Sequence, residues 1–412
     1  MITKTLDSIS FPLREEFDFS FVSRWGRVFK AFPDQDSGNI CFGTERNGER
    51  FFLKFAGAPT ARYEGKVSDA INRLKAAAVV YKDLRHPCLV ELVEELEIGG
   101  GYLTVFRWAD GICMGKQYPE SREKFFTLPI EKRQKVFVDV LDFLLMTVER
   151  GYTPVDFYDG SILYDFEQEK TVICDIDFFE KVPYVNGMGR MWGSSRFMSP
   201  EEFTLGAKID EVTNVFLAGA VAFTLFGGEL DRSREKWLLH DDAYAVALKA
   251  VSENPADRWQ SLAEFKAAWK AAMCKCKVIT PAGKLNDYRF TVIFAKYQGR
   301  WVFPRHRKRQ TFETAGGHIE PGETPLDCAK RELWEETGAK EFTIRPVFDY
   351  WASDEIGDSN GAVFYAEITG FGELPADFEM REVGLFDSLP EELTYPFITP
   401  VLFKALTEGE DL

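Results

Sequence analysis

Three glutamates near the C-terminus have the spacing expected of ligands for one metal ion. Glu332, Glu335 and Glu336 lie in a run of helix formers, Pro325 to Thr337, that ends at Gly338. Positions i, i+3 and i+4 share one face of a helix, so the three carboxylates repel one another unless a cation lies between them. Hard divalent cations such as Mg²⁺ or Mn²⁺ prefer oxygen ligands of this kind. The spacing therefore predicts a divalent-metal site on a helix with Gly338 as its C-cap.

The residues around these glutamates extend the pattern into a longer motif. From Gly317 the sequence is GHIEPGETPLDCAKRELWEETGA, with five residues between Gly317 and Glu323 and seven between Glu323 and Arg331. This pattern resembles the Nudix box in every specified position. The resemblance implies a loop–helix–loop metal site that hydrolyses a nucleoside diphosphate linked to another group. It assigns metal ligation to the three glutamates and the Gly317 carbonyl, and structural roles to Glu323 and Arg331.

The segments that flank this motif have two interpretations each. The basic run Arg305 to Arg309 is either a solvated loop, which we place first, or a set of cations that contact substrate phosphates. Downstream, the Nudix resemblance implies another glutamate that acts as ligand or general base. Glu379 is the first candidate and Glu382 the second, with surface carboxylates as the alternative for both. The motif helix itself has the alternative of an exposed acidic helix.

Composition limits the classes of protein that the chain can represent. Its 412 residues predict two or three domains, and its net charge of −16 disfavours nonspecific binding to nucleic acid or anionic membranes. Residues 1–21 lack the apolar core of a signal peptide, and the longest apolar run, Val215 to Phe226, is too short to span a bilayer. The seven cysteines lack metal-ligand spacing, so reduced thiols and a cytoplasmic location are expected.

The first 272 residues alternate between strand and helix patterns. Strands are expected at 28–32, 40–44, 51–55, 88–93, 102–108 and 171–174, and helices at 66–84, 128–150, 211–226 and in a segment ending near 272. Asn47-Gly48 predicts a hairpin between the second and third strands. Lys54 lies within the third strand, where it is either an edge residue or a cation that faces a ligand. Carboxylates at the ends of neighbouring strands, such as Asp156 and Asp175, are suited to binding metal and orienting a hydroxyl.

This order of elements resembles a protein kinase fold over roughly residues 15–272. By that likeness Lys54 is the lysine of the third strand, Asp156 is the catalytic-loop aspartate, and Asp175 or Asp177 is the metal-binding aspartate. The likeness also places Glu201 at the end of the activation segment, paired with Arg258. It implies an ATP site that involves these residues.

Several kinase positions are altered in this sequence. The Gly-rich loop carries one glycine, Gly38, beside acidic residues, so it offers phosphates fewer free N–H groups and more negative charge. Ala77 falls where the helix glutamate is expected, and Ser161 replaces the asparagine that would hold a second metal, with Asp159 a possible substitute. ATP binding with weak or unusual phosphotransferase activity, and a pseudokinase that only binds or senses, therefore remain two alternatives.

The sequence thus predicts an α+β protein with a kinase-like domain at 1–272 and a Nudix α/β/α sandwich at 273–412. The leading function is Mg²⁺-dependent hydrolysis of a phosphoanhydride in a nucleoside triphosphate or an NDP-X substrate, with Glu335, Glu336 and Glu379 as catalytic candidates. The first alternative is a regulatory protein that senses nucleotides. The second is an active Ser/Thr kinase with an accessory Nudix domain. The expected partners are a nucleotide substrate and a protein substrate or partner of the kinase-like domain, without nucleic acid or membrane.

Overall fold

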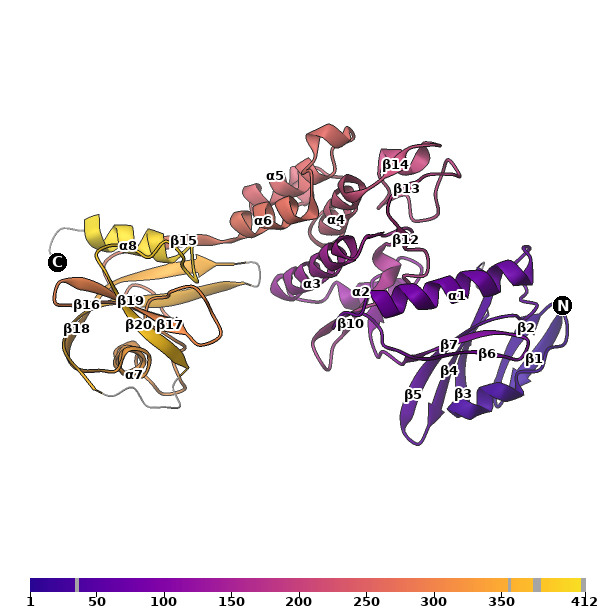
Figure 1. Ribbon diagram of the computed structural model, residues 1–412, viewed down its shortest axis with the longest axis horizontal. Helices are drawn as coiled ribbons and strands as arrows, with labels where there is room; N and C mark the ends of the chain where they lie inside the picture. Colours follow the sequence, from indigo (N-terminus) through magenta and orange to yellow (C-terminus); the bar gives the residue numbers. More distant parts are fainter. Residues whose placement is uncertain (34–36, 355–356, 373–378, 409–412) are drawn as a thin grey trace. The chain divides into compact units, whose positions relative to one another are not determined.

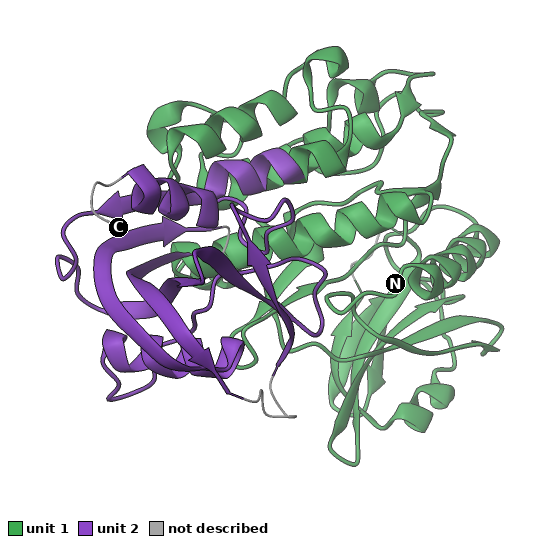
Figure 2. Ribbon diagram, turned by 60° about the vertical axis from the view of Figure 1, so that its left-hand side comes forward, with its two compact units in different colours: residues 1–266 green, residues 267–412 purple. Residues whose placement is uncertain are grey.

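The chain folds into two compact units, residues 1–266 and 267–412, which are described separately (Figure 1 and Figure 2). The computed structural model describes residues 1–33, 37–354, 357–372 and 379–408. Among these residues, no helix has both the length and the apolar character needed to cross a bilayer.

The first unit begins with an antiparallel sheet whose strand order is β3-β4-β5-β7-β6. Its strands are β3 (Arg27–Phe32), β4 (Asn39–Arg46), β5 (Glu49–Ala56), β6 (Leu92–Ile98) and β7 (Gly101–Arg107). A separate hairpin, β1 (Ile2–Leu6) and β2 (Ile9–Leu13), precedes them. Helix α1 (Val67–Asp83) packs on the sheet through Ala70, Leu74 and Ala78.

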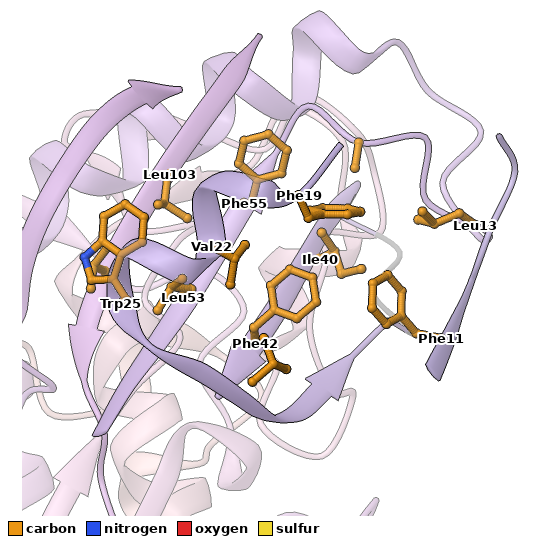
Figure 3. Packing of buried hydrophobic residues seen from close by; sticks show 13 residues of the cluster. Phe11, Leu13, Phe19, Val22, Trp25, Ile40, Phe42, Leu53, Phe55 and Leu103 are labelled. Carbon is orange, nitrogen blue, oxygen red and sulfur yellow. The ribbon is translucent and has the colours of Figure 1, made fainter. Parts of the chain in front are cut away.

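Phenylalanines dominate the core that joins the β1–β2 hairpin to this sheet. Phe11, Phe19, Phe42 and Phe55 belong to one cluster with Trp25, and Figure 3 shows their side chains gathered in it. Ring pairs such as Phe11–Phe42, with centroids 5.4 Å apart, adopt the edge-to-face geometry that aromatic quadrupoles favour. This core fixes the sheet that carries Lys54.

Two local expectations for the sheet have different outcomes. Asn47 and Gly48 both adopt positive φ, as the predicted two-residue hairpin between β4 and β5 requires. The strand predicted at 88–93 begins instead at Leu92, because Leu89 forms a parallel bridge with Ile173 and the Val90 N–H donates to the Ile173 carbonyl.

The rest of the first unit is mainly helical. It contains α2 (Pro119–Phe125), α3 (Ile130–Glu149), α4 (Glu211–Phe226), α5 (Asp241–Ala250) and α6 (Leu262–Met273), the last of which crosses the boundary between the units. A small sheet of β8 (Ile112–Cys113), β10 (Ile162–Asp165) and β11 (Lys170–Ile173) precedes the loop that carries Asp175. Residues 213–226 of α4 are all buried, which explains its uninterrupted apolar sequence.

The second unit is a mixed six-stranded sheet with a helix on each face (Figure 1). Its strands, in the order β15-β18-β19-β16-β17-β20, are β15 (Lys275–Ile279), β18 (Ala339–Ser353), β19 (Asp358–Phe371), β16 (Tyr288–Tyr297), β17 (Arg300–His306) and β20 (Met380–Phe386). Only the β16–β19 pairing is parallel among these described strands. Helix α7 (Pro325–Thr337) packs on one face and α8 (Thr399–Glu408) on the other, as an α/β/α sandwich requires.

Candidate active site

Helix α7 has well-defined ends that fix the position of its carboxylates. The Thr324 hydroxyl accepts a hydrogen bond from the Asp327 N–H, Pro325 occupies the first turn, and Gly338 ends the helix in the left-handed conformation at φ 75°. The predicted bounds and C-cap are confirmed. Ala329 and Leu333 pack against the sheet, so the glutamates lie along the edge of this buried face.

Arg331 connects the loop to the helix. Its guanidinium binds Glu323 through both carboxylate oxygens, at 2.9 and 3.0 Å, and donates to the His318 carbonyl at 3.1 Å. These hydrogen bonds from Arg331 lower the pKa of Glu323 to about 2. The bidentate geometry is the one that makes arginine–carboxylate pairs rigid. The structure therefore places Glu323 and Arg331 in contact, which fits the structural roles that the Nudix resemblance implies for them.

Arg331 also contacts two of the three predicted metal ligands. Its Nη1 lies 2.7 Å from Glu332 Oε1 and 3.1 Å from Glu335 Oε2. Among the described residues, no group of three or more His, Cys, Asp or Glu side chains is arranged so that it would hold a metal ion. The carboxylates thus share a guanidinium in this structure, which compensates the repulsion that their spacing predicts.

The third carboxylate, Glu336, is bound to the glycine loop. Its Oε2 accepts a hydrogen bond from the Gly316 N–H at 2.9 Å. Burial raises its pKa to about 9; the Gly316 hydrogen bond opposes this change, while the nearby Glu332, Glu313 and Glu335 add to it. A group in such surroundings is stabilised as an anion only if positive charge reaches it.

Gly317 allows the closest approach between loop and helix. A Cβ atom at this position would lie 2.1 Å from Glu332 Oε1, so the carboxylate occupies the space that a side chain would fill. The Gly317 carbonyl, a predicted ligand, accepts a hydrogen bond from the Thr291 N–H at 3.0 Å. The glycine is thus required by packing against the acidic helix.

The two glutamates predicted downstream lie beside side chains of the basic run. Glu379 has a side chain that is 83% exposed and lies 3.4 Å from His306 Nε2, whereas Glu382 pairs with Arg305 at 2.5 Å. The sequence did not single out Glu313, which is buried and contributes to the pKa of Glu336. No sequence pattern marks Glu313 as buried, because only the pairing of residues 312–318 with neighbouring strands places this carboxylate inside the fold.

The first unit holds a cavity of about 520 Å³ beside Lys54. Its walls combine Lys54 and Asp175 with aromatic side chains, namely Phe32, Phe52, Phe106, Trp108, Tyr118 and Tyr158. Lys54 Nζ lies 2.9 Å from Asp175 Oδ1 and 2.7 Å from Asp177 Oδ2. Burial lowers the pKa of Lys54, but the two aspartates outweigh burial and hold the pKa well above its usual value.

Tyr81 of α1 takes part in this cluster and was not predicted. Its hydroxyl donates to Asp177 Oδ1 at 3.3 Å and accepts from the Ile176 N–H at 3.2 Å. Tyr81, one turn after Ala77 on α1, thus places a neutral hydroxyl beside Asp177. Lys54 obtains its counter-charges from the 175–177 loop.

Other predicted residues of the first unit do not line the same cavity. Asp156, at φ 59°, lines a separate cavity of about 10 Å³ with Trp192 and Asn214. Ser161 is fully buried, and its Oγ has no hydrogen-bond partner within the described part of the chain. Gly38 packs under Tyr63 and Ala70 of the α1 region. The flanking acidic residues at 34 and 36 lie outside the described residues.

Two further charged residues of this unit have structural partners. Asp159 is fully buried and accepts hydrogen bonds from Arg122 at 2.9 Å and from Arg196 at 2.7 and 2.8 Å, so it is not free to substitute for Ser161 as a metal ligand. Glu201 binds the buried Arg258 through both oxygens, at 2.5 and 3.0 Å, as predicted.

Known proteins resemble the second unit. Residues 287–395 match the family model of the NUDIX domain. The chain is 28% identical over 126 residues to the putative 8-oxo-dGTP diphosphatase YtkD of Bacillus subtilis, covering 28% of this chain and 79% of that protein. It is 36% identical over 76 residues to the NAD-capped RNA hydrolase NudC of Chromobacterium violaceum, covering 18% of this chain and 28% of that protein.

Among solved structures, a mutant of the Bacillus subtilis pyrophosphohydrolase BsRppH aligns with 33% of this chain and 91% of its own, at 22% identity and a TM-score of 0.30. The match to the domain family and the geometry of the loop and helix agree on one assignment. Residues 287–395 form a Nudix domain, and through this domain the chain is a Nudix-type pyrophosphohydrolase.

Proposed function

We propose that the second unit hydrolyses a phosphoanhydride in a nucleoside triphosphate or an NDP-X substrate, with Mg²⁺ or Mn²⁺. The observation that supports this most is the packing of Glu332 and Glu336 against Gly317 and Gly316, which places two carboxylates directly on a glycine loop.

The donor set has the chemistry of a divalent-metal site. Glu332, Glu335 and Glu336 supply hard oxygen ligands, and the Gly317 carbonyl keeps a second lone pair beyond its hydrogen bond to Thr291. A bound divalent cation neutralises phosphate charge and lowers the pKa of a water molecule. To bind the cation, Glu332 and Glu335 would give up their contacts with Arg331. The pair with Glu323 would keep Arg331 in place.

The chain's own residues then have distinct tasks. Glu336 is our first candidate for general base and Glu335 our second, since the side chain of Glu336 lies beside the loop that would receive the phosphates. Glu379 and Glu382 remain weaker candidates because basic side chains already pair with them. These basic residues, His306 and Arg305, lie on β17 and are suited to neutralising a polyphosphate that approaches from this edge.

A guanine nucleoside triphosphate, oxidised or not, is the substrate that we place first. The similarity to YtkD, a putative 8-oxo-dGTP diphosphatase, covers 79% of that protein. The shorter similarity to NudC supports a dinucleotide cap as the NDP-X alternative.

The test is a phosphate- and pyrophosphate-release screen on the full-length protein. It includes nucleoside triphosphates, oxidised purine triphosphates, dinucleoside polyphosphates, ADP-ribose and nucleotide sugars, each with Mg²⁺, with Mn²⁺ and with EDTA. Turnover of one class that requires metal is expected. The absence of turnover for every substrate in the panel, with Mg²⁺ and with Mn²⁺, would contradict the proposal.

For the first unit we propose a kinase-like domain, about residues 1–272, that binds an ATP-type nucleotide in the 520 Å³ cavity. The buried Lys54 with its two aspartates, beneath an aromatic wall, favours a planar base joined to a phosphate chain. Asp156 lies in a separate cavity and Ser161 is buried, which favours binding or sensing over efficient phosphoryl transfer.

Two assays test ATP binding and phosphoryl transfer by this unit. Fluorescent ATP should bind to the wild type and lose affinity at least 10-fold in Lys54→Met. Transfer of labelled γ-phosphate that disappears in Asp156→Ala would favour the active kinase, and a protein acceptor would then be its partner. Binding without transfer would favour the regulatory alternative, and equal binding by Lys54→Met would contradict a nucleotide site in this cavity.

A further inference from the structure

Cys328 and Thr291 form a buried pair between helix α7 and the sheet. Thr291 lies on β16 and Cys328 in the first half of α7, and they are 2% and 0% exposed. The Thr291 hydroxyl oxygen lies 3.2 Å from the Cys328 sulfur. The pair therefore links the sheet to the helix that carries the three glutamates of the proposed metal site.

The same pair also contacts the backbone of the glycine loop. The Thr291 N–H donates to the Gly317 carbonyl at 3.0 Å, and a Cβ atom at Gly316 would lie 2.2 Å from the Thr291 carbonyl oxygen. The Cys328 sulfur lies 3.4 Å from the His318 carbonyl oxygen and 3.9 Å from that of Gly317. The peptide between Gly317 and His318 is thus held by β16 and by α7 together.

The hydrogen bonds of the thiol leave the Gly317 carbonyl available to a cation. A thiol has one proton, and its acceptors are the His318 carbonyl at 3.4 Å and the Glu323 carboxylate, both nearer partners than the Gly317 carbonyl at 3.9 Å. The Thr291 hydroxyl then donates to the sulfur, because the thiol proton is already used. The Gly317 carbonyl accepts from the Thr291 N–H through one lone pair, and the second points to no donor of this group.

Arg331 joins this group through the nitrogen that does not hold the predicted metal ligands. Its Nη2 lies 3.5 Å from the Cys328 sulfur and 3.1 Å from the His318 carbonyl oxygen. Its Nη1 contacts Glu332 and Glu335 instead. A cation that displaces Nη1 from the two glutamates would therefore leave the Nη2 side of the guanidinium on the thiol and the loop.

We propose that Cys328, together with Thr291, is a positioning residue that sets the Gly317 carbonyl and the α7 glutamates at the spacing that a divalent cation requires. The proposal rests on the hydrolase function proposed above and deepens it. Both side chains act through the loop backbone and not by ligation. Groups that orient metal ligands in this way typically contribute 10- to 100-fold to metal affinity.

The experiment measures Mn²⁺ binding by electron paramagnetic resonance in the full-length wild type, Cys328→Ala, Cys328→Ser and Thr291→Val. The binding that Glu332→Gln removes identifies the α7 site. At this site Cys328→Ala and Thr291→Val should each weaken Mn²⁺ affinity roughly 10-fold or more. The Mg²⁺ concentration that gives half-maximal turnover should rise by the same factor, while kcat at saturating Mg²⁺ changes little. Cys328→Ser restores a donor at this position and should recover most of the affinity.

Cys276→Ala is the matched control, because Cys276 packs in the cluster beneath α8, on the other face of the sheet. It should leave the Mn²⁺ affinity unchanged. Folded Cys328→Ala and Thr291→Val proteins with the wild-type Mn²⁺ affinity, whatever their thermal stability, would overturn the inference and leave the hydrolase function intact. Cys328→Ser that binds as weakly as Cys328→Ala would overturn the role of the thiol as a donor. A Glu332→Gln protein with wild-type Mn²⁺ binding and turnover would overturn both the inference and the metal site on which it rests.

Discussion

At the scale of single residues, the site depends on how closely Glu332 approaches Gly317. The pattern G-x5-E-x7-R-E indicated which residues to examine, and the contacts of Arg331 with Glu323 follow from that spacing. The sequence did not indicate that Arg331 would also hold Glu332 and Glu335, since the orientation of a long flexible side chain depends on its local charges.

Gly317→Ala tests the close approach directly. The added Cβ would lie 2.1 Å from Glu332 Oε1, so the carboxylate must move away from the loop. We expect the metal-dependent kcat to fall roughly 100-fold, because small displacements of a catalytic group cause losses of this size, with a small change in thermal stability. Steady-state kinetics and thermal unfolding measure the two effects.

Gly322→Ala is the control for backbone strain in the same loop. Gly322 has φ +87° and nothing within 4 Å of an added Cβ, so its replacement introduces strain without touching the carboxylate. It should retain most of the wild-type turnover. Equal losses in both variants would mean that strain, and not the Glu332 contact, explains the effect.

Glu202 gives a residue-scale prediction in the first unit. Burial raises the pKa of this carboxyl to about 7, whereas the pKa of a glutamate in the unfolded chain is near 4.5. Between these values the folded state binds more protons than the unfolded state, so stability falls as the pH rises through this range. Glutamine at 202 can still accept from the Ser199 N–H and hydroxyl, at 2.7 and 3.0 Å in the wild type, but does not titrate.

Urea denaturation of wild type and Glu202→Gln at pH 5, 6, 7 and 8 measures this difference. The variant should gain stability relative to the wild type as the pH rises to about 7, by at most about 1.4 kcal/mol per pH unit. A difference between the two proteins that does not change with pH would contradict the assignment.

At the scale of elements, hydrophobic periodicity and capping residues predicted the helices and most strands. The α7 bounds were correct because Thr324, Pro325 and Gly338 specify both ends. The start of β6 was misplaced because Leu89 pairs with Ile173, a contact between residues distant in sequence. The position of Tyr81 beside Asp177 likewise depends on how α1 packs, which helical periodicity alone does not determine.

Two leucines of α7 test which face of this helix packs on the sheet. Leu333 is fully buried against the sheet, whereas Leu326 is 36% exposed. Leu333→Ala should destabilise the second unit by about 2–5 kcal/mol, and Leu326→Ala by less than about 0.5 kcal/mol. Thermal unfolding of both variants should show this contrast. Similar losses would mean that α7 packs on another face.

At the scale of the whole molecule, each unit has its own hydrophobic core. The phenylalanine cluster around Phe42 belongs to the first unit, and the clusters beneath α7 and α8 belong to the second. The order of elements along the chain predicted two units, and the Nudix part of that prediction agrees with the family match at residues 287–395. It did not specify the surroundings of Asp156, Asp159 or Ser161, because burial of a loop residue depends on tertiary packing.

Because each unit has its own core, we expect a local change in one unit to leave the chemistry of the other intact. The measurement that tests the central claim most directly is therefore kcat for the preferred nucleotide in three full-length proteins: wild type, Glu336→Gln and Lys54→Met. Glutamine at 336 still accepts from the Gly316 N–H, a bond of 2.9 Å in the wild type, so the fold should persist. We predict that Glu336→Gln loses roughly 10²- to 10⁴-fold in kcat, as removal of a general base does, while Lys54→Met keeps the wild-type value. Full turnover by Glu336→Gln, or a loss confined to Lys54→Met, would contradict the assignment of hydrolysis to the α7 carboxylates.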